Sequence, residues 1–208
     1  MAAEKPTYDE LLARCEQSET TLARIEHSAH VGSWEWDIES DTVTWSDELF
    51  RIFGREVGGR PPSFAEHPEL CPPEDMERLR EAVHRCVATG APYELELRAV
   101  RADGEIRHCI ARGEPETDAT GRVRRLAGSL QDVTERKQAE EAIHKTEALL
   151  EATGRMARVG GWEVDARTNE VTWTTETYRI HEVPFDQKPP LQEAIDFFHP
   201  EDRPRLTE

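Results

Sequence analysis

The chain has 208 residues, a formal net charge of −17 at pH 7 and 37% hydrophobic residues, which leaves room for one complete domain with a small core and a fragment of another. The negative charge argues against nucleic acid and anionic membrane surfaces as partners, because both would repel the chain. The sequence contains no run of about 18 consecutive apolar residues, which a membrane span needs, and its start lacks the apolar core of a signal peptide. We therefore expect a cytoplasmic segment without membrane contact.

The first predicted element is an amphipathic helix within residues 1–28. Thr7-x-x-Glu10 has the form of a capping box, which marks the start of a helix. Apolar and small residues then follow at alternating spacings of three and four, the rhythm of a coiled-coil seam between two chains. The residues of this predicted dimer seam are Leu11, Cys15, Leu22 and Ile25, with Tyr8, Ser18 and Ala29 in the same register. A helix that folds back on its own domain explains the same pattern.

The domain that follows, residues 29–135, opens with a predicted hairpin. Residues 33–38 alternate between apolar and polar side chains, residues 39–41 form a turn, and residues 42–45 form the partner strand. Ser46 is placed to cap a short helix that ends at Gly54. The segment from there to residue 73 is rich in glycine and proline.

A longer helix and three strands complete this domain. Pro73 begins the helix, its apolar positions continue through Val87, and Thr89-Gly90 ends it. Asp103-Gly104 is suited to a tight hairpin turn between strands. The three predicted strands span residues 93–99, 106–112 and 123–133.

The order of two strands, a helical middle and three strands predicts an α+β fold. We expect a five-stranded antiparallel sheet with helices on one face, flanked by amphipathic, coiled-coil-like helices, and a cleft between helices and sheet. The candidates for lining this cleft are apolar side chains from the hairpin, the helices and the last strands: Trp36, Trp45, Phe50, Phe53, Leu79, Val83, Leu97 and Ile110. Tryptophans serve more often as packing residues than as a stacking box for an aromatic ligand.

A linker helix is predicted over residues 136–157, and its seam repeats that of the first helix. Ile143 and Leu150 occupy the large apolar positions, and small or hydroxyl side chains occupy the others. Such a seam packs weakly, which allows its register to shift. Gly154 lowers the stability of the helix near its end by about 1 kcal/mol relative to alanine, which is consistent with a hinge.

Residues 158–208 repeat the front of the domain. Residues 31–37 return as residues 159–165, and residues 43–45 return as residues 171–173, at an offset of 128 positions. A period this long indicates tandem globular domains, because solenoid units repeat every about 20–50 residues. We therefore expect residues 158–208 to be the N-terminal half of a second domain, truncated before the last three strands.

Together these segments resemble a PAS domain with its closing PAC motif. The resemblance is carried by residues 32–37, 46–54, 103–104 and 128–137, and it covers residues 29–135 in full. It implies a sensory and dimerisation module of a bacterial-type signalling protein, most often a histidine kinase or a diguanylate cyclase. The implied partners are a second copy of the chain, an output domain in the same chain and a small-molecule ligand.

The closing Asp-Ile-Thr motif of that family is matched by Asp132-Val133-Thr134. The resemblance implies that Asp132 accepts hydrogen bonds where the last strand meets the exit helix and that Thr134 caps this helix. These two residues would then relay a signal from the cleft to the helix. The same geometry also serves merely to tie a helix to a sheet.

The ligand is not identified by the sequence. Light-sensing relatives carry an Asn-Cys-Arg-Phe-Leu-Gln stretch for flavin chemistry, which is absent around Cys71 and Cys86. Haem-binding relatives use a histidine of the long helix, where His84 stands without another haem feature. We therefore predict neither flavin nor haem. Two functions remain open: a sensor of a small ligand or cellular state, and a ligand-free architectural module that sets spacing in a dimer.

We predict no catalytic and no metal site in this chain. The four cysteines form neither a Cys-x-x-Cys pair nor a zinc-type spacing with histidine. His144 lacks the following acidic residue and proline that the phosphoacceptor helix of a histidine kinase needs. No glycine-rich nucleotide loop follows a strand.

Overall fold

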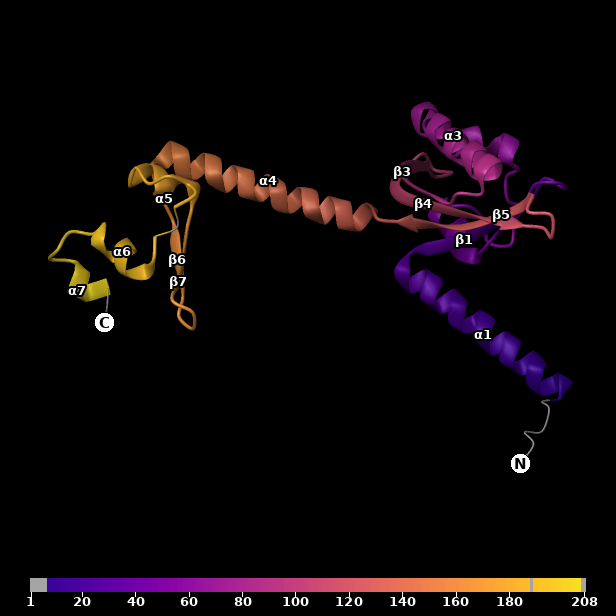
Figure 1. Cartoon of the computed structure of the whole chain (residues 1–208), viewed down its shortest axis with the longest axis horizontal. Coiled ribbons are helices and arrows are strands. Elements are labelled where there is room, and N and C mark those ends of the chain that lie inside the picture. The colour runs from indigo at the N-terminus through magenta and orange to yellow at the C-terminus, as the bar shows by residue number, and fades with distance from the viewer. Residues whose placement is uncertain (1–6, 188, 207–208) are drawn as a thin grey trace. The chain divides into compact units, whose positions relative to one another are not determined.

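The computed structural model describes residues 7–187 and 189–206 and divides the chain into two compact units, with the division between Gln138 and Ala139 (Figure 1). The elements of the first unit are, in chain order, α1 (Tyr8–Ala29), β1 (Val31–Asp37), β2 (Thr42–Trp45), α2 (Asp47–Ile52), the 3₁₀ helix η1 (Phe64–Glu69), α3 (Pro73–Thr89), β3 (Tyr93–Val100), β4 (Ile106–Thr117) and β5 (Val123–Asp132). The chain then continues through α4 (Thr134–Ala157).

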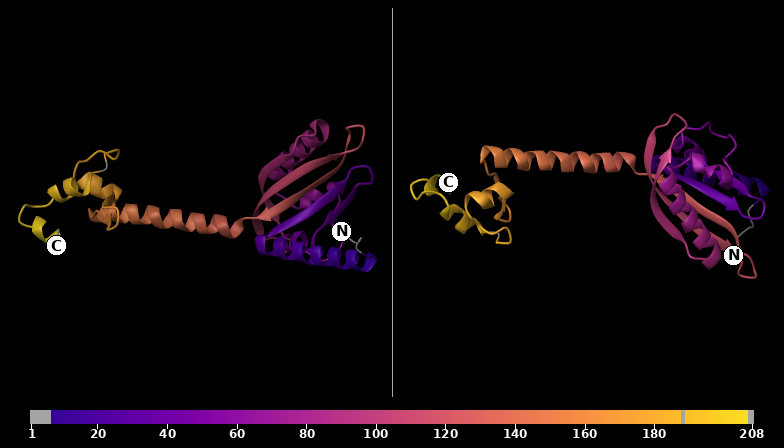
Figure 2. Two further views of the ribbon diagram at one scale, coloured as in Figure 1. Left: turned by 60° about the horizontal axis from the view of Figure 1, so that its bottom comes forward. Right: turned by 90° about the horizontal axis from the view of Figure 1, so that it is seen from above.

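The five strands of the first unit form one antiparallel sheet in the order β2-β1-β5-β4-β3. β1 therefore pairs with both its hairpin partner and the last strand, which brings the two ends of the domain together. α3 lies along one face of the twisted sheet (Figures 1 and 2), and the core is shared by α2, α3 and that face. The predicted α+β fold with a five-stranded antiparallel sheet is confirmed.

α1 begins at the predicted capping box. The Thr7 N–H donates to Glu10 Oε2 (2.8 Å), and the Glu10 N–H donates to Thr7 Oγ1 (3.3 Å). Within Tyr8–Ala29 only Glu26 is buried, whereas the seam residues Leu22 and Ile25 are 56% and 60% exposed. The helix contacts β1 and α2 near its C-terminal end and leaves its apolar stripe uncovered by its own domain. The alternative of a helix folded back along its domain is therefore wrong for this structure.

α2 packs closely against β1 because position 32 is a glycine. A Cβ atom at Gly32 would lie 2.6 Å from the Cα of Leu49. Ser46 precedes α2, but its hydroxyl makes no cap; it accepts the Ser33 N–H (3.0 Å), and the Ser46 N–H donates to the Ser33 carbonyl (2.9 Å). Ser46 therefore occupies the predicted N-cap position, but its hydroxyl holds the start of α2 on the hairpin and makes no capping hydrogen bond.

The glycine- and proline-rich segment contains an element that the composition did not reveal. η1 begins after Ser63 with a capping box, in which the Ser63 N–H donates to Glu66 Oε2 (2.8 Å). The following helix, α3, begins at Pro73 and ends before a left-handed Gly90 with φ of 70°, as predicted. η1 places the side chain of His67 between the helical layer and the sheet.

The first turn of α3 is held on β3 by a buried carboxylate. Asp75 is 4% exposed. Its Oδ2 accepts both the backbone N–H of Arg98 (3.0 Å) and the Nε–H of the same residue (2.7 Å). Because one carboxylate oxygen satisfies two donors of the strand, the spacing between α3 and the sheet is well defined.

The second unit repeats the local geometry of the first hairpin. Its elements are, after the shared helix α4, β6 (Trp162–Asp165), β7 (Glu170–Trp173), α5 (Thr175–Ile180), α6 (Leu191–Asp196) and α7 (Arg203–Leu206). Trp162 pairs with Trp173 as Trp34 pairs with Trp45. The Gly161 N–H donates to the Thr174 hydroxyl (2.9 Å), the same bond that links residues 33 and 46.

Candidate functional site

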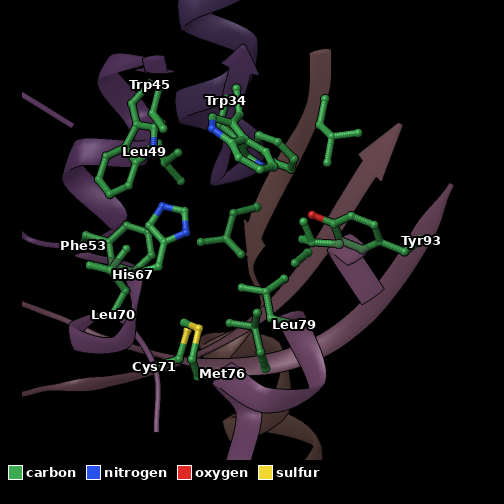
Figure 3. Close-up of a pocket in the computed structure, with 17 residues that line it drawn as sticks. Trp34, Trp45, Leu49, Phe53, His67, Leu70, Cys71, Met76, Leu79 and Tyr93 are labelled. Carbon is green, nitrogen blue, oxygen red and sulfur yellow. The ribbon is translucent and has the colours of Figure 1, made fainter. Parts of the chain in front are cut away.

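A cavity of about 80 Å³ lies between the helical layer and the sheet of the first unit (Figure 3). Side chains from β1, β2, α2, η1, α3 and the three last strands surround it. The lining residues are Trp34, Trp36, Val43, Trp45, Leu49, Phe53, His67, Leu70, Cys71, Met76, Leu79, Val83, Tyr93, Leu97, Ala111, Leu126 and Leu130. A cavity of this volume is smaller than the about 300–1,000 Å³ of sites for drug-sized ligands and is large enough for water-sized or slightly larger molecules.

The structure brings most of the predicted cleft residues together at this cavity. Six of the eight candidates line it: Trp36, Trp45, Phe53, Leu79, Val83 and Leu97. Phe50 is buried at 3% exposure but lies outside the lining, where its ring packs edge-to-face on Trp45 with 5.3 Å between centroids.

Ile110 lies on the opposite face of the sheet and not in the cavity. Its neighbours Cys109 and Ala111 are 1% and 4% exposed and point into the core. Successive side chains of a strand point to opposite faces, so the residue between them points away. The prediction was wrong by one position in β4, because hydrophobicity alone favoured isoleucine over its smaller neighbours.

Several lining residues were missed by the sequence analysis. Tyr93 had a detectable signal, since it shares the alternation of β3 with Leu97, and Ala111 follows the inward Cys109 by two positions. His67 had none, because it comes from η1, whose composition indicates no regular element.

The polar groups of the cavity are neutral. Burial lowers the pKa of the His67 imidazole to about 4, and it raises the pKa of the Cys71 thiol to about 12. Burial also raises the pKa of the Tyr93 hydroxyl. At pH 7 these three side chains therefore carry no charge, and none of the other described lining residues is an acid or a base. Because the thiolate is the reactive form of cysteine, the raised pKa of Cys71 disfavours its reaction with electrophiles at pH 7.

The described residues offer neither a metal site nor a membrane span. Within residues 7–187 and 189–206, no group of three or more histidine, cysteine and carboxylate side chains is arranged to hold a metal ion. In the same ranges, no helix has both the length and the apolar character that crossing a bilayer requires. His84, the histidine of α3, is exposed and does not line the cavity.

Asp132 and Thr134 lie at the junction of β5 with α4, where Asp132 accepts hydrogen bonds and the Thr134 side chain does not cap the helix. Asp132 Oδ1 accepts the Thr134 N–H (2.9 Å), so the aspartate caps the helix. The Thr134 hydroxyl accepts the His108 N–H of β4 (2.8 Å) and is buried. The prediction that Thr134 caps the helix was wrong, because its hydroxyl is used by a strand far away in the sequence.

This junction also joins the end of α1. The Asp132 N–H donates to the carbonyl of His30, the residue that caps α1 (2.9 Å). In the last turn of α1, His27 Nδ1 lies 2.8 Å from Oε2 of Glu48, a residue of α2 that is 4% exposed. The incoming helix, the outgoing helix and α2 are thus connected by direct polar contacts.

Ion pairs continue from this junction to the far end of α2. Arg107 Nη1 lies 3.5 Å from Asp132 Oδ2, and its Nη2 lies 2.9 Å from Glu105 Oε2. Arg101 Nε lies 3.3 Å from the same Glu105 oxygen. The Arg101 guanidinium also donates to the last carbonyl of α2, that of Ile52 (2.9 Å). A contiguous set of polar contacts therefore extends from the C-terminal end of α2 to the N-terminus of α4.

Residues 42–130 match the family model described as the PAS fold. This segment of the first unit belongs to a PAS domain. The chain is similar to the probable diguanylate cyclase DgcE of Escherichia coli K12, with 29% identity over 124 residues, 59% of this chain and 11% of that protein. It is also similar to the sensor protein FixL of Bradyrhizobium diazoefficiens, with 28% identity over 121 residues, 58% of this chain and 24% of that protein.

A third curated relative is a blue-light-activated histidine kinase of Brucella ovis, with 35% identity over 124 residues, 60% of this chain and 24% of that protein. The chain thus spans between 11% and 24% of the length of these relatives. Among solved structures, a sensory box histidine kinase/response regulator from Burkholderia thailandensis has 26% identity and a TM-score of 0.49, and the match covers 63% of this chain and 96% of that one.

Proposed function

We propose that this chain is a sensory and dimerisation segment of a cytoplasmic signalling protein. Its PAS domain would detect a small molecule in the cavity and pass a conformational change through helical linkers to an output domain of the same chain. The observation that carries this proposal is the junction at which Asp132 both caps α4 and bonds to the end of α1. The similarity to two kinase or sensor proteins and a probable cyclase supports a kinase or a cyclase as the output.

The route from cavity to linker would use the ion pairs along the sheet end. Phe53 lines the cavity, and its carbonyl accepts the Ala102 N–H (3.0 Å) next to Arg101. A ligand that displaces the end of α2 would therefore strain the contacts of Arg101 and, through Glu105 and Arg107, the cap of α4. Such a set acts as a relay only if it has two arrangements that the ligand biases.

Dimerisation would use the predicted seams of α1 and α4. In α1 the seam residues Leu11, Leu22 and Ile25 are 46%, 56% and 60% exposed. In α4, Ile143 and Leu150 are 58% and 67% exposed. Apolar side chains at heptad spacing and left uncovered by the chain itself favour pairing with a second copy. Cys15, also exposed, belongs to the same stripe.

We infer that residues 158–208 are the front half of a second PAS domain. The support is the repeated register of Trp162 with Trp173 and the repeated left-handed residues: Arg158 and Asn169 have φ of 53° and 56°, and their counterparts 128 positions earlier, His30 and Asp41, have φ of 51° and 49°. Non-glycine residues adopt this conformation rarely, so its recurrence at equivalent positions supports a shared architecture.

The proposal includes neither flavin nor haem as the ligand. Both are far larger than a cavity of about 80 Å³. Cys71, the cysteine at the cavity, has its pKa raised to about 12, which disfavours thiolate chemistry with a chromophore. The alternative function is a ligand-free architectural PAS module that sets the spacing of a dimer, with the cavity as an imperfection of packing.

Native mass spectrometry of the 208-residue protein tests the proposal. We expect a dimer, and a variant with Leu22→Glu and Ile25→Glu should be monomeric, since both charges would enter the seam. Val57→Glu, at an exposed apolar residue outside the helices, is the matched control and should stay dimeric. A dimer without the extra mass of a bound molecule, in which added ligands never change the amide hydrogen exchange of α4, would favour the architectural alternative. A wild-type monomer would contradict both.

A further inference from the structure

The chemistry of the cavity limits what it can bind. Three tryptophans and a set of aliphatic side chains form its wall, and none of the 17 described residues that line it is charged at pH 7 (Figure 3). A carboxylate, phosphate or ammonium group would be desolvated there without a counter-ion, which is strongly unfavourable. Charged ligands are therefore disfavoured.

The size of the cavity sets a second limit. An engineered apolar cavity of about 150 Å³ takes up benzene. The cavity of this domain, at about 80 Å³, has about half that volume. Without rearrangement of the wall it accommodates a molecule of about three to five non-hydrogen atoms, or a monatomic gas such as xenon.

His67 supplies the polar feature of the site. Figure 3 shows its imidazole directed into the cavity from η1, on the side of Phe53 and Leu70, while Tyr93 lies on the opposite side. The Nε2 atom of His67 is buried. A neutral imidazole offers one N–H donor and one lone-pair acceptor, so a hydroxyl group can bond to it in either tautomer.

We propose that the cavity selects neutral, mostly apolar molecules of about three to five non-hydrogen atoms that carry one hydroxyl or carbonyl group, and that His67 is the residue that recognises this group. This inference rests on the proposed function, in which the cavity is the sensing site. It adds the ligand class and the specificity-determining side chain. It also separates this chain from proteins whose cavities hold large cofactors.

The experiment uses the indole N–H signals of the ¹⁵N-labelled 208-residue protein. Trp34, Trp36 and Trp45 line the cavity, whereas Trp162 and Trp173 belong to the second unit and serve as internal controls. The probes are xenon, 2-propanol and acetate. Xenon reports whether the cavity takes up any guest, and 2-propanol and acetate have the same number of non-hydrogen atoms but differ in charge.

We expect xenon and 2-propanol to shift the signals of the three cavity tryptophans in a saturable manner and acetate to leave them unchanged. His67→Phe and His67→Leu should keep xenon uptake but weaken 2-propanol binding about fivefold to tenfold, the effect of one lost buried hydrogen bond. His84→Phe, at an exposed position of α3, should bind like the wild type.

The outcomes separate this inference from the proposal on which it rests. Uptake of xenon together with equal binding of acetate and 2-propanol would overturn the ligand class. Unchanged 2-propanol binding in both His67 variants would overturn the role of that residue. In either case the cavity would remain a candidate sensing site. Exclusion of all three probes, xenon included, would overturn the inference and the cavity-based sensing function together.

Discussion

Acidification should destabilise the PAS domain through one side chain, His67, which is partly buried and whose Nε2 atom is fully buried. Burial lowers the pKa of this imidazole from 6.5 to about 4, despite the opposing influence of the Asp41 and Glu66 carboxylates. In the unfolded chain the group keeps its ordinary pKa and is mostly protonated at pH 5. The unfolded state then binds more protons than the folded state, so stability is lost as the pH falls below about 6.5, and the loss levels off below about pH 4.

The size of this loss follows from the two pKa values. Between pH 7 and pH 5, the linkage relation gives a decrease of about 2 kcal/mol in the free energy of unfolding. His67→Gln cannot be protonated and should lack this part of the acid sensitivity. Other histidines and the carboxylates titrate alike in both proteins, so the difference between the two acid losses isolates the imidazole.

The assay is urea unfolding of the full chain at pH 7 and pH 5, followed through the indole signals of Trp34, Trp36 and Trp45, which report on the PAS domain alone. His84→Gln, at an exposed histidine, is the matched control and should lose as much stability as the wild type. Equal acid losses in the wild type and in His67→Gln would refute the reasoning, because the imidazole would then be solvated in the folded domain.

Three further predictions concern packing, capping and thiol reactivity. Gly32→Ala should lower the free energy of unfolding by about 1–3 kcal/mol, because the added Cβ would lie 2.6 Å from the Leu49 backbone; an unchanged urea midpoint would contradict the close packing of α2 on β1. Asp132→Ala removes a helix cap worth about 1 kcal/mol. Asp132→Asn keeps this cap and loses only the ion pair with β4. Amide hydrogen exchange in the first turn of α4 should therefore accelerate about fivefold in the alanine variant and stay unchanged in the asparagine variant. Equal exchange rates in the two variants would argue against that role. At pH 8, iodoacetamide should alkylate exposed Cys15 and spare Cys71, whose pKa burial raises to about 12; rapid labelling of Cys71 in a mass-spectrometric digest would show that the cavity opens readily.

The sequence by itself determined the elements whose signals are local. A capping box needs only Thr7 and Glu10, three positions apart, and its two hydrogen bonds form as predicted. α3 is bounded by Pro73 and Gly90, whose backbone preferences favour the start and the end of a helix independently of their surroundings. The strands, the α+β class and six of the 17 described residues that line the cavity followed in the same way, because alternation within a strand assigns side chains to two faces.

Only the tertiary structure decided which of two local possibilities is used. Because side chains alternate along a strand, Ile110 and Ala111 point to opposite faces of the sheet. The pairing of β4 with its neighbours and the position of α3 decide that the alanine faces the core. The Thr134 hydroxyl accepts a hydrogen bond from β4, 26 positions away in the chain, which leaves Asp132 to cap α4. His67 enters the cavity from a segment with no periodic pattern. In each case the deciding contact joins residues far apart in the sequence. These residues come close enough to interact only when the sheet forms and the helices pack on it, so local sequence patterns do not reveal the contact.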